Sequence, residues 1–552
     1  MLTVGLYGIP DTTTGQGPTF THDHGIALMR DGRVVTVIEL ERSTGVKHDN
    51  RLPAFLLELL GPWLRPGEPV RFASANSFAG DTFFSSDGNL RIEPERAPGV
   101  EPAAVPARCR WFPDGRTPRR AEAWVVPHEL AHIASALPFV GTLAPGTLLI
   151  HIDGGASHSA CSFWLWDGRA LSLLHHAWGD LKDVVNNFNA SPLAGAILGE
   201  PPAAHLAMPG KLMGYAAWGR PDPDLGAWLR ERRWFLGFRG DRAALLRELS
   251  ERRGEPMTGF SLRDPWLMTV AACLQQAFED DVVEAISNFA RRTGARHLIY
   301  AGGAALNIPT NRRLLESGLF DRMHIPPPAS DAGLALGAAA WIEFAERGAL
   351  KPCGPFLNRF DLDGLEAEPS VDVEPVADLV AAGRVVGLCL GAGEAGPRAL
   401  GHRSLIARAD DPTLRARVSE QLKRREWYRP LAPMLHADAA REVLGPLAAE
   451  ADISRFMLGA WEVRAPWRGA FAGVLHADGT VRPQVVREED PELAWQARLL
   501  RCLREKHGLM GVINTSFNVR GQPIVQRREE ARAAARTMGL DALVLPDRLE
   551  RP

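Results

Sequence analysis

The stretch GIALMRDGRVVTVIEL, residues 25–40, decides the fold of this chain. It holds two apolar, β-rich runs joined by an Asp-Gly pair at 31–32, which predicts a β-hairpin. Another β-rich run, LTVGLYG at residues 2–8, precedes it. The pattern returns at residues 147–176, where TLLIHIDGGA stands before a second hairpin around Asp167-Gly168.

Two strand-plus-hairpin units, each followed by helical patterns, predict a duplicated α/β domain of the actin, hexokinase and sugar-kinase type, with a ligand held between its halves. Two unrelated hairpins are the alternative. The clearest helical pattern covers residues 264–294, where apolar residues recur every three or four positions. Residues 351–375 are rich in Pro, Gly and acids without helical period, so we predict domains at 1–355 and 376–552. The second domain is expected to begin with a helix from Val376.

The composition is that of an ordinary folded protein. Of 552 residues, 45% are hydrophobic and 23% charged, and a net charge of −3 gives no general basic field for nucleic acid or anionic lipid. No two of the six cysteines form a C-x-x-C pair, so neither a zinc knuckle nor a redox dithiol is indicated. The first residues do not resemble a signal peptide, and no apolar run is long enough to cross a membrane, so we expect a cytoplasmic protein.

The segment VVPHELAHIASAL offers a metal site. His128 and His132 are four residues apart, so on a helix both imidazoles reach one cation. Read literally, this is the H-E-x-x-H of zinc peptidases with Glu129 as base; two helix histidines facing a polar cleft are another alternative. We favour both imidazoles together with Asp153 of HIDGG and Asp331 of ASDAG, where nearby glycines allow close approach. Two imidazoles and two carboxylates suit Fe²⁺, Mn²⁺ or Zn²⁺.

Glycine loops mark a second kind of site. The segment AGGAALN, residues 301–307, places Gly302 and Gly303 at a strand end before a helix expected near Asn311, where backbone N–H groups can face a phosphate or sugar. An ordinary tight turn is the alternative. The segment DAGLALGAA, which begins at Asp331, is another Gly-rich helix start.

Arginine and lysine are concentrated near the start of the second domain. Guanidinium groups bind phosphate and carboxylate oxygens in pairs, so this concentration predicts a site for a polyanion such as ATP with an acyl phosphate. The residues are Arg398, Arg403, Arg408, Lys423, Arg424, Arg425 and Arg429. A solvated helix face explains Arg424 and Arg425 equally well. The later loop Asn514-Thr515-Ser516-Phe517-Asn518 suits phosphate or nucleotide contact, or a simple turn.

Taken in chain order, the motifs of the whole sequence resemble those of the NodU/CmcH/TobZ carbamoyltransferases. They are H-D-x-x-x-A-L from His22, E-x-E-R from Glu39, Lys47-His48, H-x-x-x-H from His128, D-G-G from Asp153, A-G-G-x-A-L-N from Ala301, D-A-G-x-A-L-G-A-A from Asp331, G-P-R-A-L-G-x-R-S from Gly396, L-K-x-R-E-x-x-R-P-x-A-P from Leu422, H-x-D-G-T-x-R-x-Q from His476 and N-T-S-F-N-x-R-G-x-P-I-V from Asn514. Each motif alone is weak, but their common order is specific.

The resemblance implies an N-terminal duplicated actin-like (ASKHA/RNase H-like) domain that transfers a carbamoyl group, and a C-terminal α/β YrdC-like domain that forms carbamoyl-adenylate. ATP, bound with Mg²⁺, and carbamoyl phosphate would give carbamoyl-adenylate and pyrophosphate. The carbamoyl group would then pass to a hydroxyl of a small molecule, such as a sugar or an antibiotic. We expect no nucleic-acid or membrane partner, and the assembly that the resemblance allows is a homodimer.

The resemblance also implies roles for individual residues, carried over by motif. The metal, Fe²⁺ or else Mn²⁺ or Zn²⁺, would be bound by His128, His132, Asp153 and Asp331. Catalytic roles fall to His22, as base for the acceptor hydroxyl, and to Lys423 and Arg398. Contacts to ATP and carbamoyl phosphate fall to Arg398, Arg403, Lys423, Arg429, Arg482, Asn514, Thr515, Ser516 and Asn518. Contacts to the adenylate in the first domain fall to Gly302, Gly303, Asn307 and Gly333.

The sequence departs from the family pattern where the acceptor is expected. His24 and Gly25 replace the usual small residues after H-D, behind an extra Thr/Gly-rich stretch at 11–21, and Ala156-Ser157-His158 follows D-G-G. Two alternatives keep parts of the fold. One is a tRNA-modification or hydrogenase-maturation carbamoylase, although the zinc-finger cysteines of the latter are missing. The other is a non-catalytic nucleotide sensor, against which the arginine set argues.

Overall fold

The computed structural model of the chain describes residues 1–8, 21–76, 83–155, 158–201 and 204–552. Three sheets organise it, and the first has eight strands in the order β3-β2-β1-β4-β8-β7-β6-β5. Its strands are β1 (Leu2–Tyr7), β2 (Gly25–Arg30), β3 (Arg33–Glu39), β4 (Val70–Asn76), β5 (Phe83–Phe84), β6 (Leu90–Pro94), β7 (Val105–Trp111) and β8 (Glu122–Pro127). The second sheet has the order β11-β10-β9-β12-β13. Its strands are β9 (Thr147–Ile152), β10 (Cys161–Trp166), β11 (Leu171–Ala177), β12 (His297–Ala301) and β13 (Arg322–His324).

The two sheets repeat one topology. In each, a hairpin lies on one side of the first strand and pairs with it antiparallel. On the other side two further strands run parallel to it: β4 beside β1 and β8 beside β4 in the first sheet, β12 beside β9 and β13 beside β12 in the second. Both predicted hairpins are therefore confirmed, and the first two sheets form the predicted duplicated actin-like domain.

The third sheet belongs to the C-terminal α/β part of the chain, as predicted. It is mixed, with the order β19-β16-β20-β15-β14-β21-β22. Its strands are β14 (Val386–Cys389), β15 (Arg403–Arg408), β16 (Ala432–His436), β19 (Gln484–Val486), β20 (Val512–Ser516), β21 (Ala542–Leu545) and β22 (Arg548–Glu550). Helices α13 (Val373–Ala381), α14 (Pro412–Ala416), α15 (Ala437–Val443), α16 (Pro446–Glu450), α17 (Asp452–Arg455), α18 (Ala494–His507) and α19 (Arg528–Met538) surround it, with a short hairpin of β17 (Trp461–Glu462) and β18 (Thr480–Val481).

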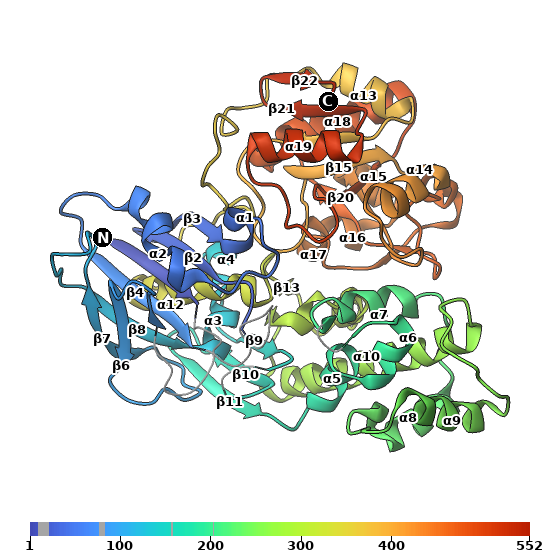
Figure 1. The fold of residues 1–552 in the computed structure, drawn as a ribbon, viewed down its shortest axis with the longest axis horizontal. Helices are drawn as coiled ribbons and strands as arrows, with labels where there is room; N and C mark the ends of the chain where they lie inside the picture. The colour runs from blue at the N-terminus through green and yellow to red at the C-terminus, as the bar shows by residue number, and fades with distance from the viewer. Residues whose placement is uncertain (9–20, 77–82, 156–157, 202–203) are drawn as a thin grey trace.

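The helices of the actin-like domain fall into two groups. Near the sheets lie α1 (Leu40–Thr44), α2 (Leu52–Leu60), α3 (His128–Ala134), α4 (Leu137–Val140), α11 (Ile308–Glu316) and α12 (Leu334–Arg347). A helical group follows β11 and faces the C-terminal part in Figure 1: α5 (Lys182–Asn189), α6 (Pro192–Leu198), α7 (Met208–Ala216), α8 (Pro223–Glu231), α9 (Arg242–Arg253) and the long α10 (Pro265–Thr293). Within the described residues, no helix is both long and apolar enough to span a membrane.

Two glycines allow α12 to pack directly on its neighbours. A Cβ added at Gly5 of β1 would lie 2.0 Å from the Ala335 carbonyl oxygen, and one added at Gly337 would lie 1.7 Å from that of Ala131 in α3. Only a residue without a side chain permits such backbone approach. Helix α3 is thereby held at the cleft between the two lobes.

Two helices begin three residues before their predicted starts. The helix expected near Asn311 begins at Ile308, because the Asn307 side chain accepts a hydrogen bond from the Thr310 N–H and caps it. The helix expected at Val376 begins at Val373, where Asp372 caps it in the same way. Both caps could be recognised in the sequence, because an Asn or Asp stands before a first turn that contains Pro or an acidic residue.

The E-x-E-R motif joins the first lobe to the C-terminal part. Buried Glu39 accepts a 2.6 Å hydrogen bond from the Gly396 N–H, and Arg42 pairs with Glu39 at 2.6 Å and donates to the Gly396 carbonyl. Asn358 of the connecting segment donates to both Glu39 and the Glu394 carbonyl. The loop that carries Arg398 is thus fixed against the first lobe.

Candidate active site

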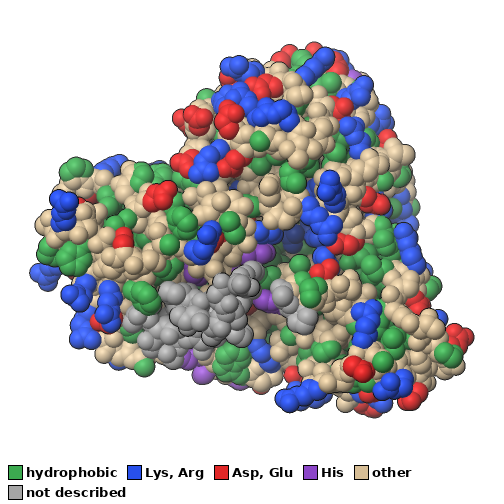
Figure 2. All heavy atoms as spheres, viewed as in Figure 1, with side chains coloured by type: hydrophobic (Ala, Val, Ile, Leu, Met, Phe, Trp, Pro, Cys, Tyr) green, Lys and Arg blue, Asp and Glu red, His purple; other side chains and the backbone are tan. Residues whose placement is uncertain are grey.

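A cavity of about 1520 Å³ lies where the two lobes and the C-terminal part meet. Figure 2 shows histidines in this hollow, with lysine and arginine side chains along the C-terminal side above it. The cavity lining includes His22, Asp153 and Asp331 at one end and Lys423 and Arg429 at the other. The residues that the sequence placed in two separate sites therefore share one space.

The four predicted metal ligands come together at the first end. The Nε2 atoms of His128 and His132 are 2.9 Å apart. His132 Nε2 lies 3.5 Å from Asp331 Oδ1 and 3.7 Å from Asp153 Oδ2. Strand β8 leads directly into α3, so both imidazoles face the cleft from one helix side. The Tyr7 hydroxyl donates to Asp331 at 2.8 Å, and the Gly303 N–H donates to Asp153.

This cluster fits a divalent cation. His132 lies in one group of possible ligands with Asp153 and Asp331 and in another with His128 and His151, so imidazole nitrogens and carboxylate oxygens that suit Fe²⁺, Mn²⁺ or Zn²⁺ surround it. Burial, and then the charge of His132, lowers the pKa of His128 to about 3, so this imidazole is neutral and can offer a lone pair. Tyr7 and the Gly303 N–H orient the two carboxylates from behind, as second partners of metal ligands commonly do.

The sequence interpretation missed His151. It lies on β9 two residues before Asp153, so the two side chains share one face of the strand. His151 is fully buried, its ring is stacked on His132 at 5.0 Å, and its Nε2 has no hydrogen-bond partner in the described chain. The H-x-D spacing at a strand end was the available signal.

His22 lies at the edge of the cluster, with its Nε2 3.9 Å from Asp331 Oδ2. Its Nδ1 is 3.0 Å from Asp23, and the other oxygen of Asp23 is 2.7 Å from His48 Nδ1. Burial alone would lower the pKa of His22, but the Asp331 and Asp23 carboxylates raise it to about 9. Asp23 and His48 were quoted within motifs without a role, and both adopt positive φ, at 56° and 57°. Such backbone strain concentrates at functional sites.

One of the departures from the family pattern, His24, lies beside this end. His24 lines the cavity, is fully buried against Tyr7 and finds no partner for either ring nitrogen in the described chain. Burial lowers its pKa to about 3. Ala156 and Ser157, like most of the 11–21 stretch, lie outside the described residues.

Glu129 is not available as the base of a peptidase. Its Oε1 accepts hydrogen bonds from the N–H groups of His158 and Ser159, at 2.8 and 2.9 Å, and from the Ser159 hydroxyl. The carboxylate is fully buried and holds the segment after the D-G-G loop. The zinc-peptidase reading of H-E-x-x-H therefore fails on geometry.

The second end of the cavity is built by cations. A smaller space of about 120 Å³ adjoins the large one and shares Arg398, Arg425 and Arg429 with it, while Arg482 lines the smaller space alone. In the described chain, Arg398 and Arg482 have neither a carboxylate nor another acceptor within bonding distance, and Arg425 has no carboxylate. Burial and then Arg429 lower the pKa of Arg398 to about 10. Such a group is satisfied only by an anionic ligand.

Lys423 is the most buried of these cations. It follows a π-helical turn, Arg417–Leu422, and its ammonium group donates to Ser516 Oγ at 2.9 Å and Asn518 Oδ1 at 2.6 Å. π-Helical turns are frequent at functional sites. Burial, and then the charges of Arg425 and Arg429, hold the pKa of Lys423 well below its usual range. Lys423 and the predicted 514–518 loop thus form one unit.

Several predicted contacts lie elsewhere or are already used by the protein. Arg403 does not line either space; its guanidinium donates to the carbonyls of Leu390, Gly391 and Gln526 and holds the glycine loop. Gly333 also lies off the lining, where a Cβ would meet the Pro328 oxygen. Four further predicted residues already have partners within the protein. The Gly303 N–H donates to Asp153, and the Asn307 amide bonds to Gln275 and Thr310. The Asn514 amide donates to Gln484 and Ala399, and the Ile152 backbone lies against Gly302.

Comparison with known proteins places the chain in a family. A model of the carbamoyltransferase N-terminus matches residues 113–340, and one of the carbamoyltransferase C-terminus matches residues 377–551. Nodulation protein NolNO of Sinorhizobium fredii is 30% identical over 99% of this chain and 82% of that protein. Nodulation protein U of Rhizobium tropici is 27% identical over 92% of this chain and 91% of its own length.

Solved structures add little. The ROK hexokinase from Thermus thermophilus covers 62% of this chain and 97% of its own, at 14% identity and a TM-score of 0.28. The fold assignment rests instead on the repeated strand order.

The molecule is thus an enzyme that transfers a carbamoyl group. The chain belongs to the carbamoyltransferase family.

Proposed function

We propose that the enzyme is an ATP-dependent O-carbamoyltransferase that activates and transfers the carbamoyl group at the two ends of one cavity. Arg398, Arg425 and Arg482, which lack carboxylate partners, support a polyanion site for ATP and carbamoyl phosphate. The His/Asp cluster supports a metal site at the opposite end.

The first step forms carbamoyl-adenylate. Water first cleaves carbamoyl phosphate into carbamate and phosphate. A carbamate oxygen then bonds to the α-phosphorus of ATP, and the bond from that phosphorus to pyrophosphate breaks. Lys423 and Arg398 neutralise negative charge on the phosphates in a partly dry space, where each interaction is stronger than in water. Mg²⁺ would accompany ATP.

In the second step the acceptor oxygen bonds to the carbamoyl carbon, the bond to the adenylate oxygen breaks, and AMP leaves. His22 is the group placed to take the hydroxyl proton, because Asp23 fixes its other nitrogen. The Asp331 carboxylate is the main cause of its raised pKa, and a cation bound to Asp331 would offset that charge and lower the pKa toward neutrality, so that Nε2 can accept the proton. His128, His132, Asp153 and Asp331 would hold the metal, which supplies a positive charge for the oxygens of the reacting groups.

The test is incubation with ATP, carbamoyl phosphate and Fe²⁺, Mn²⁺ or Zn²⁺ in turn, with pyrophosphate and carbamoyl-adenylate measured. Release of pyrophosphate that requires carbamoyl phosphate is expected. A complete lack of release with every metal would overturn the proposal. A parallel reaction with bulk tRNA as acceptor separates the tRNA-modifying alternative from a small-molecule transferase.

A further inference from the structure

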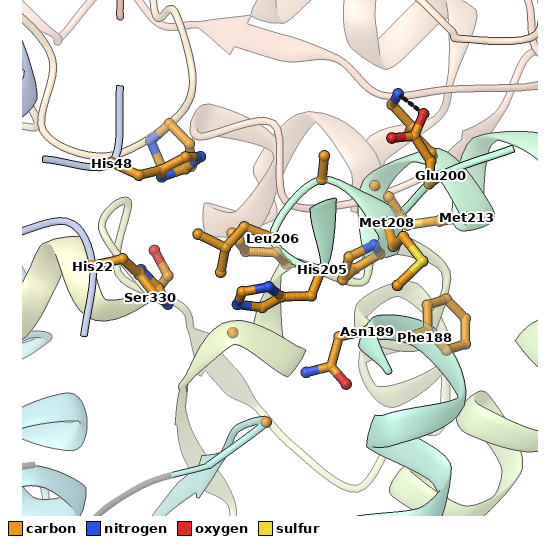
Figure 3. A pocket seen from close by; sticks show the side chains of 18 of the residues that line it. His22, His48, Phe188, Asn189, Glu200, His205, Leu206, Met208, Met213 and Ser330 are labelled. Carbon is orange, nitrogen blue, oxygen red and sulfur yellow. Dashed lines mark hydrogen bonds and ion pairs between the residues drawn. The ribbon is translucent and has the colours of Figure 1, made fainter. Parts of the chain in front are cut away.

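One part of the cavity has no role in the steps above. It is formed by α5, α6, α7 and the start of α9, and we call it the helical chamber. Figure 3 shows its walls across the space from His22 and Ser330, with Leu206 and His205 between. Its apolar lining is Val185, Phe188, Leu206, Met208, Met213 and Phe238.

The charged groups of the helical chamber already have contacts within the protein, and one of them, Lys211, has two carboxylate partners. Lys211 pairs with Glu200 at 2.5 Å and with Glu426 at 2.7 Å. The Lys182 ammonium lies 4.7 Å from the ring centre of Trp178. At the rim, Asp241 caps α9 and Arg242 stacks over Phe260. A charged ligand would therefore lose its hydration here and would have to displace a carbonyl, ring or N–H contact that the charged residue already makes.

Asn189 connects the helical chamber with the metal cluster. It is the last residue of α5 and lines the cavity, and its Oδ1 is buried without a hydrogen-bond donor in the described chain. Its amide nitrogen lies over Gly154, the residue after Asp153. A Cβ added to Gly154 would lie 2.4 Å from that nitrogen. A buried amide oxygen without a donor is unfavourable, because it has lost its hydrogen bonds to water. A ligand N–H or O–H at this point would remove that cost.

We infer that the acceptor is a neutral amphiphilic alcohol, whose apolar body occupies the helical chamber and which donates a hydrogen bond to Asn189 Oδ1. This inference rests on the proposed function, since the reacting hydroxyl must face His22. Sugar phosphates and polycationic aminosugars match the chamber less well, because their charges would have to displace contacts that its residues already make.

Binding, measured without catalysis, tests this. The purified full chain is titrated by ligand-observed NMR with hexyl β-glucoside, methyl β-glucoside, glucosamine and glucose 6-phosphate. We expect the hexyl compound to bind at least tenfold more tightly than the methyl compound and the two charged sugars not to displace it. Asn189→Ala should weaken hexyl glucoside binding at least fivefold. Asn187→Ala is the matched control, since Asn187 is on the same helix and buried but does not line the cavity.

The opposite results overturn the inference: no gain from the hexyl chain, tighter binding of a charged sugar, or equal losses in the two asparagine variants. Pyrophosphate release measured on the same samples separates the two claims. Asn189-dependent hexyl glucoside binding without pyrophosphate release would leave the acceptor inference standing and sink the proposed function. Pyrophosphate release together with preferred binding of a charged sugar would leave the proposed function standing and overturn the acceptor inference.

Discussion

The metal cluster and the C-terminal cation site are opposite ends of one cavity, and they differ in how their charges are balanced. At the metal cluster, His132 Nε2 lies within 4 Å of His128 Nε2 and of one oxygen each of Asp153 and Asp331, so positive and negative charges partly neutralise each other. At the C-terminal end, Lys423, Arg425 and Arg429 repel one another and no carboxylate balances Arg398. The first end can accept a cation between its ligands, whereas the second is stable only with an anion.

The difference indicates that the two ends bind independently of each other. Under the proposed function, an anionic substrate would be held by Lys and Arg side chains of the C-terminal part, and the metal would be held by His and Asp side chains of the actin-like domain. Variants at one end should therefore change one reaction and leave the binding at the other intact.

The largest effect is expected from Lys423→Met. It removes the most buried cation and leaves Ser516 and Asn518 without their shared donor, so pyrophosphate release should fall about 10³-fold, as for loss of one preorganised charge-stabilising group. Metal content, measured by elemental analysis, should not change. Arg408→Met is the control, because Arg408 pairs with Asp410 outside the cavity and should leave both readouts as they are. Equal losses in the two variants would contradict a specific role for Lys423.

His22→Asn should separate the two steps. Asn keeps a hydrogen-bonding group toward Asp23 but cannot accept the hydroxyl proton at neutral pH, so transfer to an acceptor should fall about 10²-fold or more. Carbamoyl-adenylate formation, measured as pyrophosphate release, should continue at the unchanged rate. Transfer at the original rate would remove His22 from the mechanism.

His132→Ala should act on the metal alone. Loss of a nitrogen that lies near both Asp153 and Asp331 should weaken metal binding at least tenfold, measured by competition with a chelator. Pyrophosphate release without an acceptor should persist. His151→Ala makes a useful comparison: if it weakens metal binding equally, the buried third imidazole belongs to the ligand set.

The strand-and-hairpin repeats could be predicted from the sequence, because each depends on local periodicity. The family motifs also named His132, Asp153 and Asp331, which the fold brings close together, and Lys423 with the 514–518 loop; their roles stay predictions. Arg403 was misplaced because a Gly-rich loop can present an arginine either to a ligand or to its own carbonyls, and only the fold decides. The same holds for Asn307 and Asn514, whose amides bond to residues far along the chain.

The helical chamber and Asn189 were beyond prediction for a different reason. Phe188, Met208 and Met213 look like core residues of amphipathic helices, and their position against a cavity depends on how α5 and α7 pack. His151 and His48 lie near the cluster only because β9 and the loop after α1 converge on it.

The smallest effect concerns the packing that holds the metal end in place. Gly337→Ala puts a methyl group against the Ala131 carbonyl of α3, so it should destabilise the fold by about 1–3 kcal/mol and lower the melting temperature. Because His128 and His132 lie on α3, metal affinity should fall with it, while pyrophosphate release at a temperature well below melting should stay close to that of the unaltered enzyme. Gly226→Ala in α8 is the matched control: nothing lies within 4 Å of its added Cβ, so this change should stabilise the helix by about 0.5–1 kcal/mol. If Gly337→Ala lowered pyrophosphate release as strongly as metal affinity, the two ends would be mechanically coupled through α12, and the independence inferred from their charges would fail.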